Sequence, residues 1–456
     1  MESVRRAAIR DNPTMNSGFK LGIQWCHLRS VGKAAWCATA ILLGPPSCKR
    51  DPTTVAPLPQ RAYVWQRDWN PAVIAAIHRS HRDLTGYVIL ACEIEWHDGH
   101  PRSVIPAVDW AALRTRGIPV SPAIRVMPGP VPVAADDATA RFLCEIARQR
   151  LAVIRAAGID PAELQLDFDC PQRKLGAYAK WVGALRQTIS PLPLIITTLP
   201  CWLDESGFPG LVRAASGYVL QVHSVALPPG VEHAMVCDPA LARAWTIRAA
   251  AIGVPFAISL PTYRITAGYD ACGRKIGAYS DAIRPPWPPG TSIREYATDL
   301  DAMAALVAAW QAHPPAHCTG LLWYRLPVDG DRQNCPWPAL RALTCGRPPA
   351  RSCEVRVNDH APDPQDSLSL ADLSVVNTGE TDEINLAGVS VKWNPPANPA
   401  LVEPLPGWKI TRGDHELTFH PTNRPTRLRL GAICEMGWLR FENPARIHVQ
   451  ILSEAR

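Results

Sequence analysis

The stretch LQLDFDC, residues 164–170, alternates apolar and polar side chains along most of its length. In a β-strand alternate side chains share a face, so Gln165, Asp167 and Asp169 lie together on one face. That face becomes more polar toward the carboxyl end of the strand, which core packing alone does not select. The kind of sheet that contains this strand therefore decides what the two aspartates can do.

Seven further β-rich runs flank this stretch, and several of them are continuously apolar. They cover residues 62–67, 86–96, 118–126, 193–200, 217–224, 255–263 and 320–327. Apolar residues between the runs repeat at helical spacing, as at Leu143, Ala147, Leu151 and Ile154. Strands covered on both faces that alternate with helices are typical of parallel sheets. Eight such units over residues 61–345, with no Gly-rich phosphate loop after the first strand, favour a (β/α)8 barrel over an open doubly wound sheet.

The character of the sequence changes after Cys345. Residues 346–352 have the composition of a linker, and short alternating runs separated by turn residues follow. No long helical pattern remains in this part of the sequence. We therefore expect a small all-β, sandwich-like domain over residues 353–456.

Residues 1–48 resemble an export leader. Six Lys and Arg residues precede an apolar run from Ala34 to Leu43, which is too short to span a bilayer. Cys48 follows where a lipoprotein would be lipidated, although Pro45 and Pro46 interrupt the expected lipobox. We expect an exported protein, periplasmic or anchored to a membrane through lipidated Cys48, with residues 49–60 as a linker. The alternative is a disordered leader that is not an export signal.

The composition favours a globular protein and excludes several partners. Hydrophobic residues make up 47% of the chain and charged residues 19%, which is typical of a folded protein. The net charge of +6 is mild and no Lys/Arg cluster appears, so we expect no nucleic-acid partner. The cysteines are scattered without metal-binding spacing, so we expect no metal and no cofactor. In an exported protein, two of Cys345, Cys353 and Cys335 could form a disulfide.

In a (β/α)8 barrel the catalytic groups lie at the carboxyl ends of the strands. Asp167 and Asp169 end the fourth strand and are the candidate catalytic residues. The same rule selects candidate substrate-binding residues at other strand ends: Glu93, Glu95, Arg125, Gln221, His223, Tyr263, Trp323 and Arg325. Each also has a plain structural interpretation, as an ion-pair partner, a core histidine or a packed ring.

The spacing of the two aspartates suits acid–base chemistry. Residues two positions apart on a strand lie roughly 7 Å apart at Cα. Repulsion between the two charges raises the pKa of one carboxyl, so that it can carry a proton near neutrality. Glycoside hydrolysis needs such an acid and a second group that stabilises an oxocarbenium-like transition state. The pair therefore predicts a carbohydrate substrate; the alternative is a buried polar cluster held by Arg125 or Arg67.

Four motifs, LQLDFDCP, YVWQRDW, TTLPCWL and GLLWYRLP, resemble a bacterial family of uncharacterised exported proteins, domain of unknown function 3142. The resemblance covers roughly residues 60–345 and implies no established activity. More distantly, the fourth strand is similar to the DxxDxDxE strand of family 18 glycoside-hydrolase-like barrels. Gln165 and Asp167 match the two inner Asp positions, and Asp169 matches the acid Glu. This likeness implies Asp169 as general acid, Asp167 as orienting carboxylate in a substrate-assisted reaction, and Trp323 as the floor of a sugar subsite.

Departures from that pattern keep two other classes of function open. The acid is Asp, shorter than Glu, and Gln221 and His223 stand where the family has Tyr and Asp. A non-catalytic polysaccharide-binding barrel would keep the pocket without a competent acid. A structural or assembly lipoprotein would use the barrel as a scaffold and the β domain to dock a partner.

Overall fold

The computed structural model describes residues 56–115, 117–127, 137–223, 235–280, 286–360, 369–382, 384, 386–422, 427–442 and 445–452. The leader and Cys48 lie outside these residues, so export and lipidation stay predictions. Within the described ranges no helix has the length and apolar character needed to cross a membrane.

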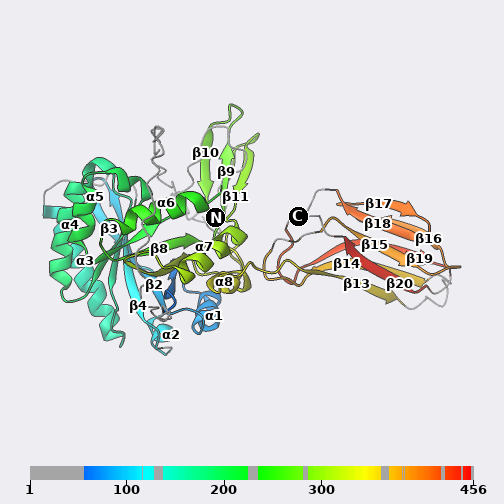
Figure 1. The fold of residues 1–456 in the computed structure, drawn as a ribbon, viewed down its shortest axis with the longest axis horizontal. Coiled ribbons are helices and arrows are strands. Elements are labelled where there is room, and N and C mark those ends of the chain that lie inside the picture. The colour runs from blue at the N-terminus through cyan, green and yellow to red at the C-terminus, as the bar shows by residue number, and fades with distance from the viewer. Residues whose placement is uncertain are drawn as a thin grey trace, which may run out of the picture.

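The first part of the described chain forms a closed barrel of eight parallel strands, which confirms the predicted fold (Figure 1). The strands pair in the order β1-β12-β8-β7-β6-β5-β4-β2, and β1 pairs with β2 to close the ring. They are β1 (Gln60–Val64), β2 (Gly86–His97), β4 (Val120–Val126), β5 (Leu164–Phe168), β6 (Leu194–Thr198), β7 (Gly217–Gln221), β8 (Phe256–Pro261) and β12 (Cys318–Tyr324).

Helices cover the outside of the barrel between successive strands. They are α1 (Pro71–Ser80), α2 (Trp110–Arg114), α3 (Asp137–Ala156), α4 (Leu175–Ile189), α5 (Phe208–Ala214), α6 (Pro239–Ala250), α7 (Leu300–Ala312) and α8 (Trp337–Thr344). Asn70, Asp109, Asp238 and Asp299 accept hydrogen bonds from the free backbone N–H groups that begin α1, α2, α6 and α7. Outward strand side chains pack against these helices in one large core.

Inward strand side chains fill the barrel interior. Tyr63, Val88, Ala123, Val219, Ala257 and Leu322 form its apolar layers. A β-bulge between Leu90 and Cys92 shifts the register of β2 against β4. Because a bulge changes the alternation, Cys92 and Ile94 pack outward while Glu93 joins Val88 on the inner side.

Two β extensions of the barrel were not predicted. Strand β2 runs into a hairpin with β3 (His100–Val104), turned by Asp98 and Gly99 at positive φ. Between β8 and α7 stands a three-stranded antiparallel sheet of β9 (Ile265–Tyr269), β10 (Lys275–Tyr279) and β11 (Ser292–Tyr296). The inner side of β9 packs beside Tyr263 and Tyr324, so this sheet adjoins the carboxyl end of the barrel.

Two four-stranded antiparallel sheets form the C-terminal domain, as predicted (Figure 1). The first sheet has the order β13-β14-β19-β16 and the second the order β17-β18-β15-β20. Their strands are β13 (Cys353–His360), β14 (Ser369–Asn377), β15 (Gly388–Trp393), β16 (Pro399–Pro404), β17 (Trp408–Gly413), β18 (Glu416–Pro421), β19 (Ile433–Phe441) and β20 (Ile447–Leu452). Side chains of both sheets, among them Val375, Val391, Phe419 and Leu439, share one core, which makes the domain a sandwich.

Polar contacts join the β domain to the barrel. Arg351 donates to Asp301 of α7 at 2.8 Å, and Arg427 pairs with Glu295 of β11. The cysteines in the described ranges are free, among them Cys335, Cys345 and Cys353.

Candidate functional site

Charged side chains meet at the carboxyl ends of β2, β4 and β5. Asp167 accepts a hydrogen bond from Thr197 Oγ1 of β6 at 2.7 Å, and its other oxygen lies 3.6 Å from Arg125 Nε. Arg125 Nη1 lies 3.6 Å from the carboxylate of Glu93, which also contacts Arg67. The structure thus brings the predicted residues Glu93, Arg125 and Asp167 into one ion network.

Glu95 extends this network toward solvent. Its carboxylate lies 3.7 Å from Arg67 Nη2 and 3.4 Å from His97 Nε2. The Glu95 side chain is 25% exposed, whereas that of Glu93 is 1% exposed. Glu95 is therefore accessible to a ligand at the mouth. Glu93 is not, and can influence a ligand only by positioning Arg67 and Arg125.

Asp169 lies one residue beyond the end of β5, with its side chain exposed to solvent. No other side chain in the described part of the chain hydrogen-bonds its carboxylate. Desolvation by the surrounding protein atoms raises the pKa of Asp169 to about 7. The negative charge of Asp167 also raises this pKa, and the positive charge of Arg125 lowers it.

Aromatic rings form a second wall of the mouth, with Tyr324 at its centre. The Tyr324 ring lies 5.7 Å from Trp65, 5.6 Å from Tyr263 and 5.5 Å from His223, on which it stacks. Arg125 Cζ lies 6.0 Å from the Trp65 ring and so joins this wall to the ion network. Aromatic rings beside charged side chains are a common combination in small-ligand sites.

His223 is held between two hydroxyl groups. Its Nδ1 lies 3.1 Å from Tyr263 Oη and its Nε2 3.1 Å from Ser259 Oγ. Burial lowers the pKa of His223 to about 4, so the imidazole is neutral near neutral pH. It therefore positions Tyr263 rather than serving as a charged acid. Gln221 ends β7 half-buried, on the inner side that Val219 also occupies.

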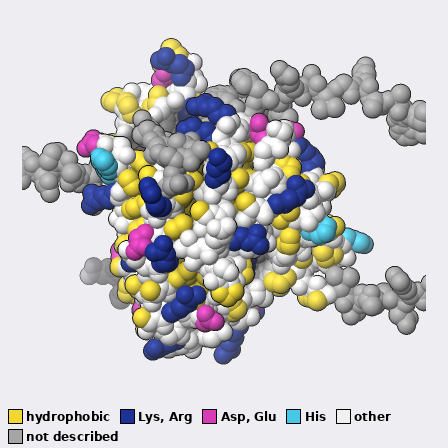
Figure 2. Space-filling view, turned by 90° about the vertical axis from the view of Figure 1, so that its left-hand side faces the viewer, with side chains coloured by type: hydrophobic (Ala, Val, Ile, Leu, Met, Phe, Trp, Pro, Cys, Tyr) yellow, Lys and Arg dark blue, Asp and Glu magenta, His cyan; other side chains and the backbone are white. Residues whose placement is uncertain are grey.

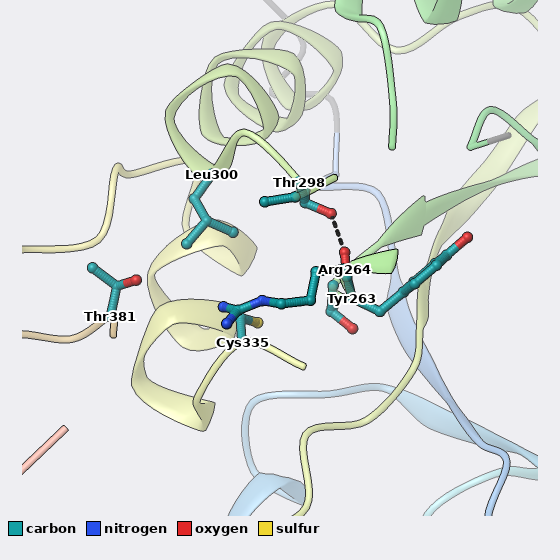
Figure 3. A pocket seen from close by; sticks show the side chains of 8 residues that line it. Tyr263, Arg264, Thr298, Leu300, Cys335 and Thr381 are labelled. Carbon is teal, nitrogen blue, oxygen red and sulfur yellow. Dashed lines mark hydrogen bonds between the residues drawn. The ribbon is translucent and has the colours of Figure 1, made fainter. Parts of the chain in front are cut away.

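Tyr263 and Arg264 project to opposite sides of the chain (Figure 3). Thr298 Oγ1 donates to the Tyr263 carbonyl at 2.7 Å and fixes the backbone between them. Arg264 points toward Cys335 and Thr381 (Figure 3). A cavity of about 10 Å³ lies there, between the barrel and the β domain. That volume holds roughly one water molecule, so this junction is no substrate site.

One predicted site residue, Trp323, lies elsewhere, and the prediction for it was wrong. Trp323 is fully buried in the core between barrel and helices, where its Nε1 donates to Gln60 at 2.9 Å. The alternation of β12 points Tyr324 to the mouth in its place. Arg325, another predicted site residue, is 5% exposed and donates to Asp331 at 2.5 Å.

Sequence reasoning missed Trp65 and Tyr324. The signal for Trp65 was available: it follows inward-facing Tyr63 by two positions. Tyr324 could not be distinguished from Trp323, because β12 is apolar on both faces and its alternation is hidden.

A cavity of about 390 Å³ opens at the opposite, amino-terminal end of the barrel. Its lining includes small strand residues, Gly217 and Ala257, and the ion pair of Arg61 with Glu163 at 2.7 Å. None of the predicted site residues lines it. Among the described residues, no group of three or more His, Cys, Asp or Glu side chains could hold a metal ion.

The face of the molecule that Figure 2 shows carries mixed side chains. In the view of Figure 2 the Lys and Arg groups are dispersed among apolar and acidic groups. This distribution is typical of a solvated surface rather than of a groove that follows a phosphate backbone.

Residues 125–329 match the family described as "Domain of unknown function (DUF3142)", and the match contains both aspartates. No curated protein matches the sequence.

Several solved structures resemble the chain. A chitinase from Chromobacterium violaceum ATCC 12472 is 15% identical, with 63% of this chain and 98% of that chain covered and a TM-score of 0.43. The spore cortex-lytic enzyme SleL of Bacillus cereus is 12% identical, with 64% and 74% covered and a TM-score of 0.46. A chitinase from Bacteroides thetaiotaomicron is 10% identical, with 59% and 90% covered and a TM-score of 0.43. Likenesses this distant assign neither residues nor activity, and the barrel rests on the strand pairing described above.

Proposed function

We propose that the barrel is a glycoside-hydrolase-like enzyme that acts on a bacterial or extracellular polysaccharide. The observation that carries this proposal is the pair at the end of β5: an open carboxyl with a raised pKa, Asp169, beside a carboxylate fixed by two partners, Asp167. The ring wall around Tyr324 supports it, because sugar rings present C–H groups that pack on aromatic faces.

In this mechanism Asp169 is the general acid. Its proton passes to the glycosidic oxygen as the bond to the anomeric carbon breaks. Asp167 orients the reacting group and stabilises the positive charge that develops on the sugar. A group of the substrate attacks the anomeric carbon, as in a substrate-assisted reaction, and water then completes hydrolysis while its proton returns to Asp169.

The second candidate is a polysaccharide-binding barrel without catalysis. Two observations favour it: Asp169 extends less far than a glutamate, and Arg125 lowers its pKa and so opposes the protonated form. Binding needs the ring wall and the carboxylates but not the proton. A third candidate, an assembly lipoprotein, requires no carbohydrate ligand.

We also propose that the protein is exported and anchored through Cys48. Fractionation of cells that produce the full chain tests this, with Cys48→Ser as the comparison. Membrane attachment that Cys48→Ser abolishes is the expected result, and a cytoplasmic full chain would refute the proposal.

A glycan-array binding screen of the full chain, followed by an assay of reducing ends on every hit, tests the barrel. Asp169→Asn removes the acid, and Asp160→Asn is the matched control, since Asp160 is an exposed aspartate before the amino end of β5. Binding with release that only Asp169→Asn abolishes is the expected result. Binding without release would favour the second candidate, and no binding at all would refute both carbohydrate proposals.

A further inference from the structure

The cavity of about 390 Å³ at the amino-terminal end of the barrel is part of the barrel interior. We call it the amino-end cavity. Neighbouring strands of the ring line it, namely β1, β12, β8, β7 and β6, together with the residue before β5. Its lining includes Arg61, Glu163, Ile195, Gly217, Ala257 and Thr319. The volume lies within the range of roughly 300–1,000 Å³ that is usual for small-molecule sites.

Small side chains keep this space open. In a (β/α)8 barrel, bulky branched side chains usually fill the interior. Here Gly217 contributes no side chain, and Ala257 contributes only a methyl group. Gly86 also makes room, because a Cβ at this position would lie 2.9 Å from the Pro119 carbonyl oxygen and 3.3 Å from Arg61 Cδ. The sequence of the strands therefore both leaves the hollow and positions the stem of Arg61.

The ion pair in the lining is only partly used. Arg61 Nη1 donates to Glu163 Oε1 at 2.7 Å and to Ser121 Oγ at 3.4 Å. Within the described chain, Arg61 Nε and Nη2 and Glu163 Oε2 make no hydrogen bond, and none of these atoms is sealed from solvent. The surface pair of Arg79 and Asp329, in contrast, joins both nitrogens to both oxygens at 3.0 Å. The cavity thus contains an open donor edge beside an open acceptor.

A buried side chain fixes the orientation of this pair from the inside. Gln165 is fully buried, and its Nε2 donates to Glu163 Oε1 at 2.8 Å. Its own Oε1 accepts a hydrogen bond from Tyr63 Oη at 2.9 Å. The carboxylate of Glu163 is therefore held in place before any ligand arrives. Polar groups that are already ordered lose less conformational freedom on binding.

We infer that the amino-end cavity binds a small uncharged polyol, of the size of a monosaccharide. Neighbouring hydroxyls of a polyol can accept from the open edge of Arg61 and donate to Glu163 Oε2, while its C–H groups contact Ile195 and Ala257. An apolar ligand would bury the open nitrogens and oxygen without hydrogen bonds, which is costly.

The charges and the shape of the cavity disfavour other ligands. Among the described residues that line it, Arg61 and Glu163 are the only charged side chains, so the lining carries no net charge. The two charges already compensate each other at 2.7 Å and would recover little of the dehydration cost of a charged ligand. A protein partner would have to insert side chains into the ring of strands as far as Ala257, which is 3% exposed. The inference goes beyond the proposed function, because it needs neither hydrolysis nor binding at the mouth.

Ligand-observed NMR titration of the full chain tests the inference. The uncharged probes are myo-inositol, glucose and N-acetylglucosamine, and the charged probes are acetate, ethylammonium and L-alanine. At least one uncharged probe should bind with a dissociation constant of about 1 mM, the scale that a ligand of about a dozen heavy atoms reaches. The charged probes should not bind.

Four variants locate the site. Ala257→Val places a branched side chain in the cavity and should abolish binding, and Glu163→Gln should weaken it at least about tenfold. Asp329→Asn alters a surface ion pair and is the matched control for Glu163→Gln; it should leave affinity unchanged. Tyr324→Ala should also leave it unchanged, which separates this cavity from the mouth.

Near-ultraviolet circular dichroism verifies the fold of each variant. Glu163→Gln keeps the shape of the side chain, so it decides the question if Ala257→Val does not fold. The inference would be overturned if no uncharged probe binds, if a charged probe binds more tightly, or if affinity in the folded cavity variants equals that of the parent. Loss of binding in Tyr324→Ala alone would assign the probe to the mouth and would also overturn it.

Discussion

Replacing Arg125 with methionine tests the ion network at the barrel mouth. Arg125 is 15% exposed and lies between Glu93, which is 1% exposed, and Asp167. Removing one partner of a buried ion pair usually costs about 3–5 kcal/mol, because the other charge stays buried. Glu93 keeps its contact with Arg67, and Arg125 lies 3.6 Å from both Glu93 and Asp167, which is long for an ion pair. We therefore expect a loss at the lower end of this range, about 3 kcal/mol.

Guanidinium unfolding at about pH 7, followed by near-ultraviolet circular dichroism, measures this loss. Arg79→Met is the matched control, because Arg79 pairs with Asp329 on the surface and should cost less than about 1 kcal/mol. In the double variant Arg125→Met/Glu93→Gln the buried charge is also removed, so more than half of the stability should return. A loss below about 1 kcal/mol in Arg125→Met, or a double variant as unstable as the single one, would refute the reasoning.

Three further predictions follow from the site and the sandwich. Reducing-end release should fall about tenfold per pH unit above a midpoint at about pH 7, because Asp169 then loses the proton that it must donate; a rate that does not change up to about pH 9 would contradict this. Trp323→Ala should cost about 3–5 kcal/mol of folding free energy, whereas Tyr324→Ala should cost less and weaken glycan binding. Unfolding and glycan titration of both variants measure this, and a larger loss of stability in Tyr324→Ala, with weaker binding only in Trp323→Ala, would contradict it. Gly437→Ala should destabilise the β domain by at least about 1–3 kcal/mol through its clash with the Glu403 carbonyl, and an unchanged calorimetric transition would disprove it.

The barrel was predictable because its strands and helices carry strong local patterns. Each of the eight predicted runs overlaps a barrel strand, and the structure confirms the β domain. The sheet of β9, β10 and β11 was missed, since most side chains of β10 and β11 are at least partly exposed and leave no apolar pattern to read. A hairpin signal was nevertheless present in the turn residues between β9 and β10.

The site was predictable only where a strand alternates clearly between apolar and polar residues. In β5 the alternation separates Asp167 from Leu166 and Phe168 without ambiguity, and the ion network places Asp167 inside. In β12 the run is apolar on both faces, so the inward side could be chosen only from tertiary contacts, and Trp323 was chosen in place of Tyr324. The partner of Arg325, Asp331, lies in the loop that follows, and no periodicity of the sequence reveals the path of that loop.

The rate of reducing-end release at about pH 6, from the glycan that binds best, tests the central claim most directly. The comparison is between the full chain, Asp169→Asn and Asp160→Asn. We predict that Asp169→Asn lowers the rate at least about 100-fold, the usual contribution of a general acid, while affinity for the glycan changes much less. Equal rates in the full chain and Asp169→Asn, with binding intact in both, would contradict the assignment of Asp169 as the acid.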